Sequence, residues 1–366
     1  MKEMSMLLTL GFCVLLASCN QPVTKNLSEP QLKIDASIRS EVINNLSREL
    51  DESYIFAETA QKIKTDLFDR LKNGEYDSIT DAKAFAMKLT ADLQLISKDK
   101  HLHVDYFAKS LQITAKRKDP TQEEKAKRLL FDKHFNFGFK KVARMDGNIG
   151  YIDLRGFKDS ESGKETVAAA MTLISNTDAL IIDLRYNGGG EPAMVTLISS
   201  YLFGDEPVHL NDLYCRKEDK TKEFWTNPDI AGKKFKKDVY ILTSHNTFSG
   251  AEEFCYNLKH LKRATIVGQT TRGGAHPCYT CRLCEHFVAS IPEKRAINPI
   301  TKTNWEGTGV DPDFKVPENQ ALKTAYVMAL TKSLETIQEE DFKEAKKHFI
   351  KVAESESDDI NLLIKL

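Results

Sequence analysis

The segment from residue 239 to residue 267, VYILTSHNTFSGAEEFCYNLKHLKRATIV, carries the pattern that decides the fold. It begins with a short apolar run over residues 239–242, continues through a helical stretch over 251–261, and ends in a second apolar run over 265–267. Short strand-like runs separated by a helix of this length are typical of a βαβ unit. The first run and the helix are joined by Thr247-Phe248-Ser249-Gly250-Ala251-Glu252-Glu253, so a serine stands on the turn from strand to helix.

Ser249 on this turn has two interpretations. A Ser-x-x-Glu motif ahead of an apolar run is a capping box, in which the serine only satisfies amides at the start of the helix. A serine raised on a strand-to-helix turn is also a common way to present a nucleophile. The motif alone favours neither, so the neighbouring segments have to decide.

The same alternation of strand-like and helical segments continues on the N-terminal side. Residues 149–154 (IGYIDL) and 179–184 (ALIIDL) are strand-like, with a helical stretch over 167–175 between them. These segments predict an α/β core built from βαβ units, with residues 148–318 as its extent.

The segments that flank this core show a helical period. Apolar residues recur every three or four positions from residue 38 to about residue 96, which predicts a helical N-terminal domain over residues 38–105. Its end, residues 101–105, alternates like a half-buried strand. Residues 106–147 are predicted to connect the two domains, and residues 319–366 to form C-terminal helices.

Three glycines follow the apolar run at 179–184, in Asp183-Leu184-Arg185-Tyr186-Asn187-Gly188-Gly189-Gly190. Glycines allow backbone N–H groups to turn toward a ligand, as an oxyanion hole or an anion site requires. The triplet is equally compatible with a flexible turn. It lacks the Gly-Lys-Ser/Thr ending of a P-loop and the spacing of a dinucleotide fingerprint, so nucleotide binding is not favoured.

The first 19 residues have the features of a secretory signal. An apolar stretch over residues 4–16 leads into Leu16-Ala17-Ser18-Cys19, and this ending resembles the bacterial lipobox. We therefore expect cleavage before Cys19, lipidation of that cysteine, a polar tether over residues 20–37, and an extracytoplasmic location facing the periplasm. The alternative is a plain signal peptide with a chance cysteine. The apolar stretch is shorter than a membrane span, which needs about 20 residues.

Charge and cysteine content limit the classes of partner. The formal net charge is -1, with acidic and basic residues mixed along the chain, so nucleic acid is not an expected partner. An odd number of cysteines remains after the predicted signal and lipid-bearing residue: Cys215, Cys255, Cys278, Cys281 and Cys284. One or two disulfides are favoured over a structural zinc site, because no second Cys/His pair accompanies the closely spaced cysteines at 278–284.

Four segments together resemble the family of C-terminal processing and tail-specific peptidases, which includes tricorn protease and the interphotoreceptor retinoid-binding protein. They are residues 183–190, 247–252, 263–268 with Gly273-Gly274, and 304–313 (NWEGTGVDPD). The resemblance implies a crotonase-like α/β core around a mixed sheet, and it gives Ser249 the role of nucleophile. Gly250, with Gly188 or Gly189, is then expected to supply the backbone N–H groups of an oxyanion hole.

Members of this family differ in the group that takes the proton from the serine. Tail-specific members carry a lysine downstream of the serine, and the matching position here is Gly274. Tricorn-like members use a histidine ahead of the core and a glutamate after it, which match His101 in Asp99-Lys100-His101-Leu102 and Glu306. Lys100 stands where tricorn has a further serine of its catalytic set, so that auxiliary role is absent or filled otherwise. A serine, a histidine and a carboxylate form a coherent set for nucleophilic catalysis.

Two of these residues have competing interpretations. His103 lies two positions from His101, so both would face the same side of a strand, and His-x-His could also be a pair of metal ligands. No third ligand is identifiable, and no metal or other cofactor is predicted. Glu306 could instead be a solvated residue in a turn rich in glycine and asparagine.

The function that the resemblance implies is hydrolysis of peptides or unfolded protein tails by a serine peptidase anchored to a bacterial membrane. Residues 106–146 are too few to hold the PDZ domain that tail-specific members carry. A helical N-terminal region joined directly to the core is closer to the branch of the retinoid-binding protein. The alternative is therefore a non-catalytic protein that binds a hydrophobic small molecule or a peptide. Three separated reactive groups, Ser249, His101 and Glu306, favour the enzyme.

Overall fold

The computed structural model describes residues 32–110, 121–356 and 358–359. The predicted signal segment and the lipidation site Cys19 lie outside these described residues. Within them, every helix is too short or too polar to cross a bilayer.

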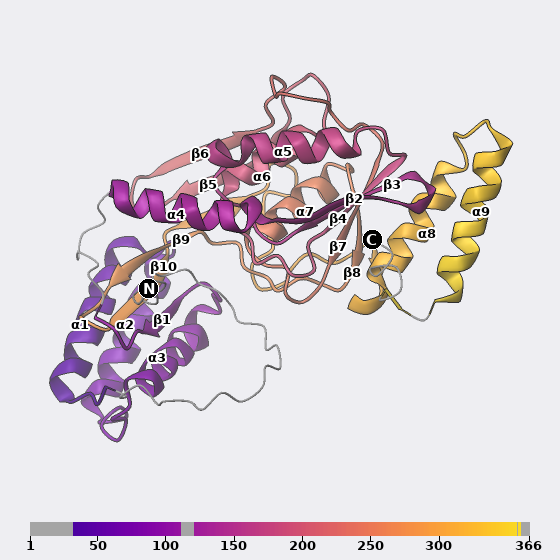
Figure 1. Cartoon of the computed structure of the whole chain (residues 1–366). Helices are drawn as coiled ribbons and strands as arrows, with labels where there is room; N and C mark the ends of the chain where they lie inside the picture. Colours follow the sequence, from indigo (N-terminus) through magenta and orange to yellow (C-terminus); the bar gives the residue numbers. More distant parts are fainter. Residues whose placement is uncertain (1–31, 111–120, 357, 360–366) are drawn as a thin grey trace, which may run out of the picture.

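A six-stranded sheet forms the centre of the molecule (Figure 1). Its strands run in the order β12 (Phe314–Lys315), β8 (Thr265–Gly268), β7 (Asp238–Thr243), β4 (Ala179–Asp183), β3 (Ile149–Leu154) and β2 (Phe139–Met145). β2 is antiparallel to β3, and the other neighbours are parallel. The predicted α/β core with a mixed sheet is confirmed, and β3, β4, β7 and β8 are the four strands expected from apolar runs.

Helices cover both faces of this sheet. One face carries α5 (Ser160–Ile174), α6 (Pro192–Ser200) and α7 (Gly250–His260), and the other carries α8 (Ala321–Ser333) and α9 (Glu340–Ser355). The parallel strands are added in one direction with crossovers of one hand, which places the connecting helices on the same face. The strands alternate accordingly: Ile152 packs in the cluster under α5 to α7, and Tyr151 packs in the cluster under α8.

The N-terminal part is a helical bundle with a strand from its own end. It contains α1 (Ala36–Ser53), α2 (Ala57–Lys72), α3 (Ala82–Ser97) and β1 (His103–Tyr106), as the sequence predicts. Asp35 and Asp81 cap α1 and α3 by accepting hydrogen bonds from backbone N–H groups in the first turn.

Two segments take up positions that the sequence did not indicate. The hairpin of β9 (Cys278–Arg282) and β10 (Phe287–Pro292) leaves the core, pairs with β1 and packs into the apolar cluster of the bundle. The stretch predicted as a connection contains α4 (Gln122–His134) and supplies β2 to the central sheet. The hairpin therefore ties the two parts of the molecule together through backbone pairing.

A smaller sheet joins β11 (Lys294–Ile297), β5 (His209–Cys215) and β6 (Lys220–Trp225). The five cysteines expected to form disulfides form none with one another in the described chain. The expectation of a disulfide among them is wrong in this structure. Burial raises the pKa of the Cys281 thiol to about 12, so this thiol is protonated and inert at neutral pH.

Candidate active site

Ser249 is the residue directly before α7, at the end of the connection from β7, and β7 lies next to the parallel strand β4. Its backbone has φ 55° and ψ -123°, a combination that side-chain-bearing residues rarely adopt. Strain of this kind persists only where the surroundings hold it, and it is typical of a nucleophile raised on a sharp strand-to-helix turn. This backbone geometry is more than a helix cap requires, although the capping interpretation is correct in part.

Glu252 holds this turn in shape. Its carboxylate accepts hydrogen bonds from the N–H of Ser249 at 2.9 Å, as in a capping box, and from the N–H of Gly273 and Gly274 at 2.6 and 2.9 Å. The hydroxyl of Thr271 donates a further bond to Oε1 at 2.5 Å. Each oxygen of a fully buried carboxylate thus has two donors, and the serine turn is fixed to the segment after β8.

The glycine loop packs directly against the serine turn. A side chain on Gly189 would meet the N of Gly250 at 2.6 Å and the Cβ of Ser249 at 2.8 Å, so only glycine fits there. The N–H of Gly189 donates to Oδ1 of Asn187 at 2.8 Å and is not available to a substrate. This corrects one member of the predicted oxyanion hole. Among the described residues, the N–H groups of Gly188 and Gly250 meet no protein acceptor.

His101 reaches Ser249 from the other part of the molecule. It lies on the turn between α3 and β1, and its Nε2 is 3.1 Å from Oγ of Ser249. Its ring stacks on Phe248 with centroids 4.5 Å apart, and the residue is 8% exposed. Burial lowers the pKa of His101 to about 4, so the imidazole is neutral at pH 7 and able to accept a proton.

His103 is placed differently from His101. It belongs to β1, where its Nδ1 lies 2.9 Å from the carbonyl oxygen of His101 and its Nε2 lies 3.2 Å from Asp105. The structure therefore brings His101, not His103, to the serine.

Gly274, which matches the lysine of tail-specific peptidases, has no room for any side chain. A Cβ at this position would lie 2.3 Å from the ring of Phe248 and 2.7 Å from Cε1 of His101. The imidazole of His101 and the ring that stacks on it therefore fill the space that a lysine would need.

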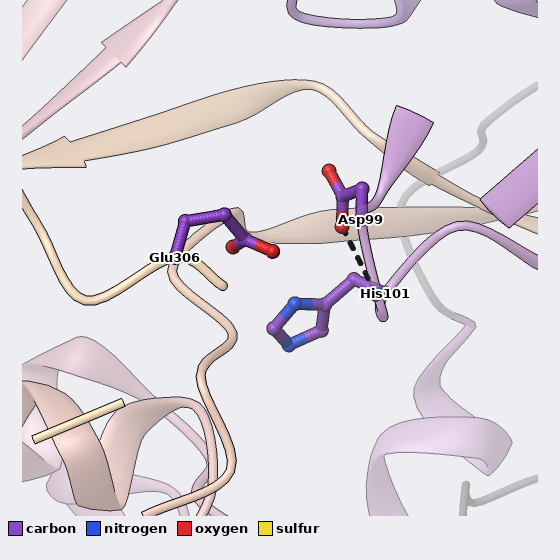
Figure 2. Close-up of side chains that lie close together, drawn as sticks. All are labelled: Asp99, His101 and Glu306. Atoms are coloured by element: carbon purple, nitrogen blue, oxygen red, sulfur yellow. Dashed lines mark hydrogen bonds between the residues drawn. The ribbon is translucent and has the colours of Figure 1, made fainter. Parts of the chain in front are cut away.

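Glu306 lies beside His101, with its carboxylate directed toward the imidazole ring (Figure 2). Its Oε2 accepts a hydrogen bond from the N–H of Ala275 at 2.5 Å. Its Oε1 and the Nδ1 of His101 are both buried without a hydrogen-bond partner. Burial, and then the nearby charge of Asp99, raise the pKa of Glu306 to about 7. Two unpartnered groups of complementary chemistry thus face the same buried space.

Comparisons with known proteins match both parts of the chain. The family model described as Peptidase family S41 matches residues 148–316, and the model of the N-terminal domain of this family in eukaryotic IRBP matches residues 32–133. Together these two matches cover more than half of the 366 residues. The chain belongs to peptidase family S41.

Individual relatives of this S41 chain are distant. A tail-specific protease of Haemophilus influenzae is 29% identical over 171 residues, which are 45% of this chain and 22% of that protein. The chloroplastic carboxyl-terminal-processing peptidase 2 of Arabidopsis thaliana is 25% identical over 176 residues, which are 47% of this chain and 32% of the relative. The chain thus spans about a fifth of the first relative and a third of the second.

Solved structures share the fold of this S41 chain. The structure of mature CPAF complexed with lactacystin aligns with a TM-score of 0.54 at 13% identity, over 87% of this chain and 100% of that chain. At this level of identity the likeness concerns the fold.

Sequence reasoning missed two residues that lie at this candidate site. Asp99, 1% exposed, accepts a hydrogen bond from the N–H of His101 at 3.0 Å. His276 places Nδ1 2.8 Å from Oδ2 of Asp99 and 3.3 Å from Oε2 of Glu306. Asp99 stands in the same motif as His101, and His276 follows the Gly273-Gly274 pair, so both lay beside signals that the sequence did show.

Asp99, His101 and Glu306 are also the described residues that come nearest to a metal-binding set. Each offers one donor atom, and these atoms lie within 4.8 Å of one another. Both oxygens of Asp99 already accept protein donors, one from the backbone of His101 and one from His276. Hydrogen bonds within the S41 chain therefore organise this cluster.

Proposed function

We propose that this protein is a serine peptidase in which Ser249 is the nucleophile, His101 the general base and Glu306 the carboxylate that orients the base. One observation carries the proposal. A half-buried serine with φ 55° and ψ -123° presents its hydroxyl 3.1 Å from a buried, neutral imidazole. A capping serine needs neither the strained backbone nor the histidine.

The reaction follows the order of acyl transfer. Nε2 of His101 takes the hydroxyl proton as Oγ of Ser249 bonds to the carbonyl carbon of the substrate. The N–H groups of Gly250 and Gly188 stabilise the negative charge that develops on the carbonyl oxygen. The imidazolium then returns the proton to the leaving amine as the C–N bond breaks. A water molecule, deprotonated by the same imidazole, hydrolyses the ester and frees the serine.

Glu306 has a separate role in this scheme. As a carboxylate it accepts the Nδ1–H of His101, which keeps the lone pair of Nε2 directed at the serine. The space shared by the unpartnered Oε1 of Glu306 and Nδ1 of His101 supports this role.

The substrates we propose are peptides or unfolded protein tails, since the family acts on peptide bonds and two curated relatives are named for processing protein termini. We further propose that Cys19 carries a lipid and that the protein acts outside the cytoplasm, on the support of the Leu-Ala-Ser-Cys sequence. Cys19→Ser should move the protein from the membrane fraction to the soluble fraction. Retention of this variant in the membrane would contradict the anchor.

Labelling with a fluorophosphonate probe tests the activated serine directly. The soluble form from Asn20 onward is expected to label, and Ser249→Ala and His101→Ala are expected to abolish labelling. Ser355→Ala, at an exposed serine on α9, is the matched control and should label like the wild type. A folded wild type that does not label would reject the peptidase and favour a binding protein of the same fold.

A further inference from the structure

His276 occupies a junction between the two parts of the molecule. It lies between the central sheet and β9, is 4% exposed, and has the ring of Phe56 packed edge-on against it at 5.2 Å. Its Nδ1 faces two carboxylates, those of Asp99 and Glu306, at 2.8 and 3.3 Å. Since carboxylates only accept hydrogen bonds when ionised, Nδ1 must carry the proton.

The two carboxylates that His276 contacts belong to opposite sides of the site. Asp99 comes from the bundle and holds the backbone of His101 through its other oxygen. Glu306 comes from the core and is held by the N–H of Ala275, the residue next to His276. The imidazole of His276 thus links Asp99, which holds the backbone of His101, to Glu306, which faces the His101 ring.

We propose that His276 is a positioning residue for the peptidase reaction: it holds Asp99 and Glu306 at a fixed separation and so keeps His101 aligned with Ser249. This inference rests on the proposed function, because alignment matters only if His101 acts as the base. The polar contacts of His276 go to Asp99 and Glu306 and not to Ser249, so we assign it no part in bond making.

The charge of Glu306 depends on the same contact. Glu306 faces Asp99 from the bundle, His276 from the segment before β9, Glu252 from α7 and the hydroxyl of Tyr54 after α1. Of these, the positive charge that His276 can carry lowers the pKa of Glu306, whereas Asp99 and Glu252 raise it. Loss of His276 therefore makes Glu306 harder to ionise.

Two amide substitutions separate the hydrogen bond from the charge. In His276→Asn the side-chain N–H₂ can take the place of Nδ1–H, whereas in His276→Gln the amide reaches the position of Nε2 instead. Both variants are neutral and of similar polarity, so each is a control for the other. The rate of fluorophosphonate labelling of Ser249 would be measured for both and for the wild type across the pH range in which each is folded.

The expected result has two parts. On the plateau at high pH, His276→Asn should label close to the wild-type rate, and His276→Gln should be slower by up to about 100-fold, as expected when a reacting pair is displaced by about 1 Å. The acidic limb should move to higher pH in both variants, because each has lost the side chain whose charge lowers the pKa of Glu306. Labelling of His276→Gln like the wild type at every pH would overturn the inference while leaving the peptidase intact.

A second measurement decides the outcome if the wild type does not label. In that case the proposed function fails, and ¹⁵N NMR of histidine-labelled protein reports on the contact itself. The inference then stands as a structural link if the signals of His101 shift in His276→Gln and not in His276→Asn. It is overturned if neither variant changes them.

Discussion

The two sides of the proposed catalytic site are built in different ways. On the serine side, the turn is fixed by backbone N–H groups that converge on one carboxylate, Glu252, and by glycines that pack backbone against backbone. On the histidine side, His101 is held by a network of side chains from both parts of the molecule: Asp99, His276 and Glu306. The first side belongs to the core alone, and the second spans the bundle and the core.

Because of this difference, we expect the two sides of the site to respond differently to pH. The geometry of Ser249 should persist as long as Glu252 is ionised, because its carboxylate accepts the four hydrogen bonds that fix the turn. Burial raises the pKa of Glu252, and these four bonds oppose that rise. The alignment and the protonation of His101 should vary with pH, because Glu306 titrates with a pKa of about 7. We therefore expect the serine side to fix the position of the nucleophile, and the histidine side to set the pH range in which the nucleophile is activated.

Among substitutions that keep Ser249 and His101, Glu306→Gln is expected to have the largest effect on the rate. Below its pKa of about 7, Glu306 is protonated and cannot accept the Nδ1–H of His101; above it, the carboxylate selects the productive tautomer. The wild-type labelling rate should therefore rise with pH up to about 7 and then level. In Glu306→Gln the plateau should fall by about 10³- to 10⁴-fold, as when the carboxylate of a catalytic triad becomes an amide.

The remaining pH dependence of Glu306→Gln distinguishes the two titrating groups. With the limb near 7 removed, the only limb left should be that of His101, whose pKa burial lowers to about 4. A rate profile measured with the same probe checks both parts. A variant that keeps the limb near 7 would assign that limb to a group other than Glu306.

Gly274→Ala tests the junction where the two sides touch. The added Cβ would lie 2.3 Å from the ring of Phe248 and 2.7 Å from His101, so the imidazole must move. We expect the labelling rate to fall by about 10³-fold or more, because a displaced base cannot take the proton from Ser249. Gly204→Ala is the matched control, since a Cβ there meets nothing within 4 Å. Equal labelling rates in Gly274→Ala and Gly204→Ala would show that the imidazole of His101 can take the proton from Ser249 from a different position.

The sequence predicted the serine side better than the histidine side, for physical reasons. The strands β3, β4, β7 and β8 are buried on both faces and so appear as uninterrupted apolar runs. Ser249 and its glycines stand at the carboxyl ends of such strands, where a local motif marks them. β6 was not predicted because most of its residues are exposed and show no apolar run.

The histidine side depends on contacts that no local pattern records. His276 meets Asp99 across 177 positions of the chain, and the hairpin of β9 and β10 joins the bundle through pairing with β1. The resemblance supplied His101 and Glu306, but it could not show that their link runs through a third residue. The availability of an N–H group is likewise invisible in sequence, which is why Gly189 was included in the oxyanion hole.

Glu252→Gln makes on the serine side the same carboxylate-to-amide change that Glu306→Gln makes on the histidine side. Whichever way the amide is oriented, its N–H₂ group faces two donors, so two hydrogen bonds to a buried charge are lost. We expect the free energy of unfolding to fall by about 3 to 5 kcal/mol. Urea denaturation measures this change. Glu306→Gln, which removes one such bond at most, should lose clearly less, and equal losses would contradict the contrast between the two sides.

Glu253→Gln examines a second buried carboxyl group on α7, next to Glu252 in the chain. Glu253 is 4% exposed on α7, and burial raises its pKa to about 7 from an ordinary value of 4.5. The native state therefore keeps a proton that the unfolded chain releases between these two values, so stability is lost as pH rises from about 4.5 to 7. Above pH 7, Glu253→Gln should raise the free energy of unfolding by up to about 3 kcal/mol, and below 4.5 it should change it little. Urea denaturation at both pH values checks this, with the exposed Glu335→Gln as control. A stabilisation that is the same at both pH values would mean that Glu253 is not the group that titrates. Because α7 begins directly after Ser249, the labelling rate of the variant should also be measured. An unchanged rate would show that the charge of Glu253 does not affect the position of Ser249.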